Sequence, residues 1–287
     1  IPDVMLEMGV DGTFHDYHAP RSNTSFPPAE FFLGKNVADV LPVDACQAVM
    51  AALGEANVQG HSEGKEFSLV TEKGSFWFEI SLTKKIDADN NEPHFIVLCR
   101  NVTQRKSSED EINKLAFYDP LTNLPNRRLM LDRLVQALAV SARSGRMGAL
   151  LFIDLDNFKT LNDTQGHDMG DLLLQQVGQR LTQCMRQGDT VARLGGDEFV
   201  VLLPQIDSAL DAGTAATHLL ERVAQPYPLG EHTLTTTFSI GIAVHPHDGD
   251  DEDTLMRHAD VAMYQAKRQG RNRFCFHADA LVATSRY

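Results

Sequence analysis

Two neighbouring acidic residues, Asp197 and Glu198, directly follow two glycines, Gly195 and Gly196. The four residues separate two apolar runs, and this arrangement predicts a hairpin turn. Because glycine has no side chain, a bulky ligand could approach the backbone at such a turn, where both carboxylates would be exposed. An ordinary Gly-Gly turn with solvated acids explains these four residues equally well.

A second acidic pair, Asp154 and Asp156, ends the apolar run at residues 150–153. A carboxylate that closes a buried strand can cap the next helix, and this simpler explanation fits Asp156. It fits Asp154 less well, because alternate residues of a strand point to opposite faces. Acids at strand ends also suit Mg²⁺, which prefers oxygen ligands and keeps phosphate and water as the others.

The string at residues 193–199 resembles the signature of the GGDEF-domain diguanylate cyclases. Asn123 stands where that family usually has glycine. Ordered motifs over roughly residues 119–277 are more specific than any one of them. The resemblance implies that two GTP molecules are condensed into cyclic di-GMP and two pyrophosphates. Further matching strings, in the family's order, are 119–127, 154–159, 162–163, 166–168, 170–171, 259–260, 264–267 and 270–272.

The resemblance implies a metal site for Mg²⁺ or Mn²⁺, with two ions per GTP. Asp154 and Asp197 would be ligands, together with the backbone carbonyl of Leu155. Glu198 would be a further ligand or the base that takes the proton from a ribose 3′-hydroxyl. Carboxylates facing a triphosphate repel it by about 1 kcal/mol per charge pair at 4 Å in water, and by about 4 kcal/mol at an effective dielectric of 20. The site should therefore need divalent metal to admit its substrate.

The same resemblance implies which residues bind the nucleotide. Asn162 and Asp171 would hydrogen-bond the guanine edge. Lys159, Lys267 and Arg271 would contact the triphosphate, and Lys159 is counted with Asp197 and Glu198 as catalytic. Lys267 has a simpler alternative, since a cation in the last helical turn complements the helix dipole. The other implied substrate contacts are Phe158, Gly195 and Gly196.

Arg186 and Asp189 form an RxxD pair upstream of the two glycines. At this offset the pair resembles the family's inhibitory site, to which the product binds. Arginine can contact phosphate in a bidentate manner, and aspartate can accept hydrogen bonds from guanine. Taken alone, the pair fits an ordinary surface ion pair. Arg222 is one candidate for a second arginine of such a site.

Alternating strands and helices should position these residues from residue 119 to the end of the chain. The continuous apolar run at 148–153 predicts a central strand that is buried on both faces. Residues 171–186 predict an amphipathic helix, and 191–203 predict the hairpin around the glycines. A strand at 235–244 and a helix at 254–269, ended by Gly270, complete the prediction. The family resemblance implies that this α/β catalytic domain has the nucleotide-cyclase, ferredoxin-like palm fold.

The first 102 residues predict a separate small α+β domain. An apolar run before the Asp11-Gly12 turn, a helical stretch at 37–55 split at Pro42, and three strands at 66–71, 75–83 and 94–101 follow one another. Their order and Gly34 resemble a PAS sensory domain, although Asn101 replaces the usual aspartate at its exit. Its ligand is not predicted: surface positions explain His15, His18, His61 and His94 better than haem binding, and Cys46 lacks the flanking residues of a flavin-binding motif.

Residues 103–118 predict a polar connecting helix with Ile112 and Leu115 near heptad spacing. The helix could pair with its twin in a dimer or stand alone in solvent. The resemblance favours the dimer, because each catalytic domain would hold one GTP and two must face each other. We therefore expect a homodimer formed through the PAS-like domain and the linker helix.

The net charge of −13 argues against binding to nucleic acid over a broad face. The four cysteines lie far apart and form no CxxC pair, as in a reduced, cytoplasmic protein. No apolar run is long enough to cross a membrane. The chain begins at Ile1, which indicates a fragment whose parent could carry an upstream anchor. Two alternatives to an enzyme stay open: an inactive GTP or cyclic di-GMP receptor, and a regulatory scaffold for a domain beyond Tyr287.

Overall fold

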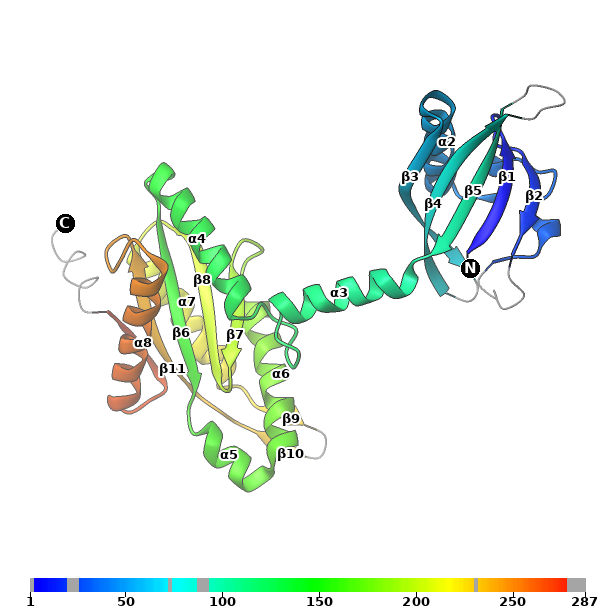
Figure 1. The fold of residues 1–287 in the computed structure, drawn as a ribbon. Helices are drawn as coiled ribbons and strands as arrows, with labels where there is room; N and C mark the ends of the chain where they lie inside the picture. The colour runs from blue at the N-terminus through cyan, green and yellow to red at the C-terminus, as the bar shows by residue number, and fades with distance from the viewer. Residues whose placement is uncertain (1–2, 20–25, 72–73, 87–92, 230–231, 278–287) are drawn as a thin grey trace. The chain divides into compact units, whose positions relative to one another are not determined.

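The computed structural model describes residues 3–19, 26–71, 74–86, 93–229 and 232–277. The chain divides into two compact units, Ile1–Ile112 (unit 1) and Asn113–Tyr287 (unit 2) (Figure 1). The division falls inside one helix, so each unit is described by itself. The expected domain boundary at residue 102 stays a prediction, and the chain end at Tyr287 lies outside the described residues.

Unit 1 is built on a five-stranded antiparallel sheet with the strand order β2-β1-β5-β4-β3. The turn expected at Asp11-Gly12 joins its first two strands, and the three strands expected further along are present, with β3 starting five residues earlier than predicted. Phe78 and Ile80 are buried while Trp77 is 38% exposed, as the alternating pattern predicts. The strands are β1 Val4–Gly9, β2 Phe14–His18, β3 His61–Thr71, β4 Gly74–Ile86 and β5 Pro93–Asn101.

Helices of unit 1 pack against this sheet. The predicted split at Pro42 is confirmed: the short α1 (Val37–Val40) ends before it and α2 (Val43–Gln59) begins after it. The α2 helix packs on β3 and β4 (Figure 1). Val49 and Leu53 are buried as expected, but Met50, expected on the same face, is 37% exposed. A one-turn 3₁₀ helix, η1, spans Ala29–Phe31.

The predicted connecting helix is present as α3 (Thr103–Phe117), and none of its residues is buried. Ile112 and Leu115 are 64% and 61% exposed, so their pairing with a second copy stays a prediction. The Asn101 side-chain oxygen accepts the Thr103 N–H at 3.0 Å. The Thr103 hydroxyl accepts in turn from the Trp77 backbone N–H at 2.9 Å.

Unit 2 is built on a mixed five-stranded sheet with the strand order β12-β11-β6-β8-β7. Only the β11–β12 pair is parallel within this sheet. The predicted central strand, β6, lies in the middle, and the predicted hairpin is β7 and β8. The strands are β6 Met147–Leu155, β7 Thr190–Gly195, β8 Glu198–Ile206, β11 Phe238–His245 and β12 Arg273–Phe276, with a separate pair β9 Tyr227–Leu229 and β10 His232–Leu234.

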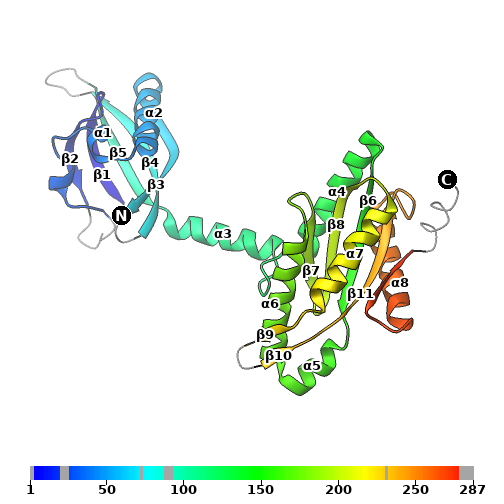
Figure 2. The same cartoon turned by 180° about the vertical axis from the view of Figure 1, so that it is seen from behind.

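Helices cover both faces of this sheet, with α4 and α7 on opposite sides (Figures 1 and 2). Leu151 and Ile153 of β6 pack with α6 and α7, while Leu150 and Phe152 pack with α4 and α8. Burial on both faces explains why this strand reads as a continuous apolar run. The helices are α4 Arg127–Ser144, α5 Phe158–Gln165, α6 His167–Cys184, α7 Ala209–Val223 and α8 Glu252–Arg268.

Several predicted boundaries in unit 2 are wrong by two to four residues. The helix expected from residue 171 begins at His167, because Gly166 ends α5 with a φ of 89° and is also the N-cap of α6. The strand expected from 235 begins at Phe238. The helix expected from 254 begins at Glu252, since the Asp251 side chain caps it by accepting from the Thr254 N–H. Among the helices in the described part of the chain, none is both long and apolar enough to cross a membrane.

Candidate active site

The Gly195-Gly196 turn joins β7 to β8 and faces open space. Gly195 and Gly196 have φ angles of +142° and +54°, a region that favours glycine. A Cβ atom added to either glycine would have no atom within 4 Å. The turn therefore leaves its backbone accessible to a ligand, as the sequence predicts, and Asp197 and Glu198 are half-buried beside it.

Arg193 fixes this turn, a role that the sequence analysis did not assign. Its guanidinium donates to the Gly196 carbonyl at 3.0 and 2.7 Å, and to both carboxylate oxygens of Asp119 at 2.9 and 3.0 Å. Burial raises the pKa of Asp119, but hydrogen bonds from Thr122 and Arg193 outweigh it and hold that pKa below its usual value. Arg193 and Asp119 belong to the matching strings at 193–199 and 119–127, but only the structure shows that they are in contact.

Asp154 lies at the end of β6, directly opposite Glu198 of β8 in the strand register. Its carboxylate is buried and forms an ion pair with the Lys267 ammonium at 2.7 Å. Burial, together with the negative charges of Asp197 and Glu198, raises the pKa of Asp154 to about 6, although the ion pair with Lys267 opposes the rise. Asp154 therefore has one cationic partner and two neighbouring carboxylates.

This group of acids fits a divalent cation by its chemistry. Oxygen ligands with excess negative charge are what Mg²⁺ and Mn²⁺ prefer. The Leu155 N–H donates to the Asp197 carbonyl at 3.3 Å, which holds the turn against the strand end. Within the described ranges, no three His, Cys, Asp or Glu residues are already arranged as a metal site, and Asp154 is paired with Lys267 instead.

Asp156 is not the helix cap that the sequence favoured. The N-cap position of α5 belongs to Asn157, whose side chain makes no capping hydrogen bond. The Asp156 carboxylate instead accepts from the Thr237 and Ser239 hydroxyls, each at 2.7 Å, and from the Asn272 N–H at 3.1 Å. It therefore anchors the loop that follows α8, which includes Arg271.

Asn162 and Asp171 come from consecutive helices, α5 and α6. The Asn162 side-chain oxygen is buried and has no hydrogen-bond partner among the described residues. A Cβ at Gly170 would collide with that oxygen, so any larger residue there would displace the Asn162 side chain. Asp171 follows Gly170 directly and is exposed. The unpartnered Asn162 oxygen therefore lies beside Gly170, the residue that precedes the exposed Asp171.

The predicted phosphate-binding cations lie on two different segments. Lys159 is exposed on α5, and Phe158 beside it is half-buried. Lys267 lies in the last turn of α8, where the helix dipole favours a cation, but its ion pair with Asp154 gives it a second role. Arg271 is exposed beyond Gly270, and its own φ of 64° is in the left-handed region.

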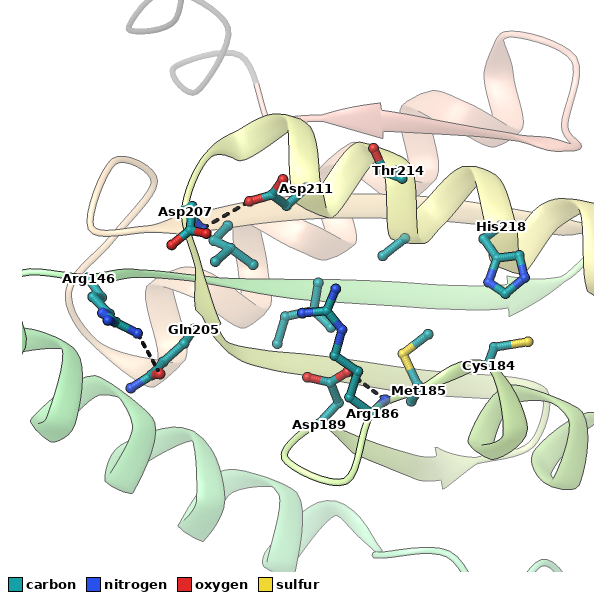
Figure 3. Close-up of a pocket in the computed structure, with 13 residues that line it drawn as sticks. Arg146, Cys184, Met185, Arg186, Asp189, Gln205, Asp207, Asp211, Thr214 and His218 are labelled. Carbon is teal, nitrogen blue, oxygen red and sulfur yellow. Dashed lines mark hydrogen bonds between the residues drawn. The ribbon is translucent and has the colours of Figure 1, made fainter.

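Arg186 and Asp189 line a separate cavity of about 500 Å³ (Figure 3). The Arg186 backbone N–H donates to the Asp189 carboxylate at 3.0 Å. Among the described residues, the side chains of Arg186 and Asp189 take part in no ion pair. Arg222, the predicted candidate, is not among the described lining residues. Arg146 from the turn after α4 lines the cavity instead.

Comparison with known proteins identifies the family of unit 2. The family model for "Diguanylate cyclase, GGDEF domain" matches residues 116–273, more than half of the chain. The chain belongs to the GGDEF diguanylate cyclase domain family. Its mixed α/β sheet matches that of solved GGDEF structures.

Several curated relatives match this GGDEF chain. The bifunctional diguanylate cyclase/cyclic di-GMP phosphodiesterase MucR of Pseudomonas aeruginosa is 49% identical over 175 residues, which cover 61% of this chain and 25% of MucR. Cyclic di-GMP phosphodiesterase PdeR of Escherichia coli is 35% identical and matches 75% of this chain and 32% of PdeR. The chain therefore spans only a quarter to a third of these relatives.

Solved structures give the same picture. The GGDEF domain of TpbB (YfiN) from Pseudomonas aeruginosa is 41% identical, with a TM-score of 0.54 over 54% of this chain and 98% of that structure. The coiled coil and GGDEF domain of DgcB from Caulobacter crescentus, solved in complex with cyclic di-GMP, is 29% identical with a TM-score of 0.55, and the match covers 61% of this chain and 93% of that structure.

Proposed function

We propose that this chain is an active diguanylate cyclase that condenses two GTP molecules into cyclic di-GMP and two pyrophosphates. The observation that carries the proposal is the intact Gly195–Glu198 turn, which lies across the strand register from Asp154. Family membership supports the reaction class, and the buried, poorly compensated acids support a metal-assisted nucleotide site.

Asp154, Asp197, Glu198 and the Leu155 carbonyl would hold Mg²⁺ or Mn²⁺, two ions per GTP. Bound metal would supply charge neutralisation at the triphosphate and would lower the pKa of the attacking 3′-hydroxyl. Lys267 would move from Asp154 to the phosphates once this carboxylate has a stronger cationic partner. Glu198 lies next to Asp197 and would ligate metal or take up the hydroxyl proton.

The protein's own residues would orient the nucleotide. The unpartnered Asn162 oxygen would accept from the guanine 2-amino group, and the Asp171 carboxylate would accept from guanine N–H groups. Phe158 would pack beside the base. Lys159, Lys267 and Arg271 would contact the triphosphate, while the open backbone at Gly195 and Gly196 would allow its close approach.

Each chain carries a single site of this kind among the described residues, so cyclisation requires a second copy that presents its GTP in antiparallel orientation. We expect that homodimer to form through unit 1 and α3. The exposed Ile112 and Leu115 of α3 support pairing of two such helices.

Product inhibition at the cavity of Arg186 and Asp189 is part of the proposal. Both side chains line a cavity large enough for a nucleotide, and Arg146 adds a further cation there. Cyclic di-GMP is present in the DgcB structure, a relative of this chain. Product bound at this cavity could cross-link two domains and keep their active sites apart.

Unit 1 is proposed to be a PAS-like sensory domain. Its antiparallel strand order β2-β1-β5-β4-β3, with helices between β2 and β3, supports this assignment. Arg105 at the start of α3 forms ion pairs with Glu66 at 2.8 Å and Glu79 at 3.0 Å, so changes in that sheet would reach the helix directly.

One experiment tests the proposed function. The chain is incubated with GTP and Mg²⁺ or Mn²⁺, and the products are identified by chromatography and mass spectrometry. Metal-dependent cyclic di-GMP is the expected product. GTP binding without turnover would favour the first alternative, an inactive receptor. The second alternative is a regulatory domain that acts beside another domain, and it is supported by relatives that are named as phosphodiesterases.

A further inference from the structure

Unit 1 contains a cavity of about 260 Å³ between its sheet and the helical segment that precedes β3. Met8, Ile80 and Val97 form its floor from three adjacent strands, and Val49 of α2 closes one side. An apolar cavity of about 150 Å³ is large enough to hold benzene, whereas drug-sized ligands need about 300 Å³ or more. The volume therefore suits a small molecule of one or two rings, or a short aliphatic chain.

Aromatic rings form much of the cavity wall. Phe14 meets Phe32 edge to face with ring centroids 5.4 Å apart, and Phe26 meets Phe78 in the same way at 4.6 Å. All four rings line the cavity. Ring edges and faces offer a flat apolar ligand the contacts that aromatic pairs prefer.

No charged residue occurs among the described residues that line this cavity. The Thr71 hydroxyl, the one hydroxyl in that lining, already donates to the Gly74 carbonyl at 3.1 Å. Burial strongly raises the pKa of the Cys99 thiol, which shows that this environment penalises negative charge. None of the histidines considered for haem lines the cavity, so the described lining offers haem no imidazole ligand.

We infer that this cavity binds an uncharged apolar small molecule, such as a monocyclic aromatic compound, and excludes carboxylates of the same shape. The inference rests on the proposed sensory role of unit 1 and names the class of its ligand. Among the described lining residues, a buried anion would find no cationic side chain, and the one hydroxyl is already bonded, whereas an apolar ring would contact the surrounding apolar side chains.

The test compares two probes of similar shape on the full chain by ¹⁹F NMR. Fluorobenzene should show saturable broadening and a shift of its resonance as protein is added. 4-Fluorobenzoate should bind at least about tenfold more weakly, because its carboxylate would have to be buried without a partner. Equal binding of the two probes, or no binding of fluorobenzene, would overturn the inference.

Cavity-filling variants locate the probe. Val49→Phe should abolish fluorobenzene binding, while Val58→Phe, the same change at an 85% exposed position of the same helix, should leave it unchanged. Circular dichroism verifies folding, and Cys99→Leu is the milder substitute if Val49→Phe does not fold. Fluorobenzene that binds both filled variants as it binds wild type would contradict the inference. GTP plays no part in this measurement, so its outcome is separate from that of the cyclase assay.

Discussion

The two units handle charge in opposite ways. The cavity of unit 1 is lined by apolar side chains, and burial there keeps the Cys99 thiol neutral. In the candidate active site of unit 2, Asp154 pairs with Lys267 and lies near the carboxylates of Asp197 and Glu198, and burial together with these charges raises the pKa of Asp154 to about 6. Burial therefore favours the neutral ligand that we infer for unit 1 and the metal cation that we propose for unit 2.

The largest expected effect concerns the base. Asn162 and Asp171 offer acceptors to guanine N–H groups that adenine lacks, and pairing with ATP would leave the Asp171 carboxylate without a donor. Sites that hydrogen-bond their substrate in this way reject analogues by about 10⁴-fold. Steady-state rates with GTP and ATP at saturating Mg²⁺ measure the ratio. Comparable rates with GTP and ATP would contradict the assignment of Asn162 and Asp171 to guanine binding. They would also weaken the contrast between a polar site in unit 2 and an apolar cavity in unit 1.

Removal of one acid should be the next largest effect. Asp197→Ala should lower turnover on the order of 10³-fold, because the metal ion proposed to neutralise the reacting phosphate would lose a ligand. The control is Asp253→Ala, an exposed acid in the first turn of α8. Unfolding curves should remain similar for both variants. Near-normal synthesis of cyclic di-GMP by Asp197→Ala would contradict the proposed metal site.

The Arg193–Asp119 pair should control the stability of unit 2. Arg193→Met leaves the partly buried Asp119 carboxylate without its cation, which should lower the free energy of unfolding by about 1–3 kcal/mol. Urea denaturation followed by circular dichroism measures it. A double-mutant cycle with Asp119→Asn should give a coupling energy well above zero. Strictly additive effects would show that the pair is dispensable for the turn.

The same pair predicts a pH dependence with a definite sign. The pKa of Asp119 is lower in the folded state than in the unfolded state, so its contribution to stability is complete above the unfolded pKa and is lost as the pH falls through the folded pKa. Wild-type stability should therefore decline more steeply on acidification below about pH 4 than that of Asp119→Asn. Parallel curves would mean that another carboxylate is responsible for the decline.

The feedback site should give a smaller effect. Arg186→Ala should leave initial GTP turnover near wild type but raise the inhibitory concentration of cyclic di-GMP. A charge-assisted contact is worth about 1.5–3 kcal/mol, which corresponds to roughly tenfold to a hundredfold. Arg257→Ala is the matched control, because Arg257 is exposed on α8 and is not among the described lining residues of the cavity. Inhibition that weakens equally in both variants would assign the effect to general charge.

Much of unit 2 could be predicted because its chemistry requires particular residue types. Two glycines at a turn, and a buried strand that ends in acids, are visible in the sequence without any contact information. The role of Asp156 was not visible, since its partners Thr237, Ser239 and Asn272 lie 81, 83 and 116 positions away. A local helix cap was the only explanation available from neighbouring residues, and it was wrong.

The cavity of unit 1 could not be predicted at all. Its lining residues, such as Val97 and Phe78, are of the types that also fill a hydrophobic core. Their spacing in the sequence does not show whether they surround a cavity or pack against one another. The packing of α2 shows the same limit: Val49 and Met50 have similar hydrophobicity, yet only Val49 is buried. Hydrophobic patterns indicate which face is apolar but not how completely it is filled.

The smallest expected effect concerns Asn123, the position where the family usually has glycine. Its φ of 56° lies in the left-handed region, which asparagine tolerates and branched side chains do not. Its N–H donates to the Asp119 carbonyl at 2.8 Å, so this conformation helps to hold the residue that pairs with Arg193. Asn123→Gly should change the free energy of unfolding by less than about 1 kcal/mol, because relief of strain offsets the entropy of a freer unfolded chain. Asn123→Val should cost about 1–2 kcal/mol. If urea denaturation found the valine variant as stable as the glycine variant, this loop would not need its left-handed residue, and the turn at Gly195-Gly196 would depend on Arg193 alone.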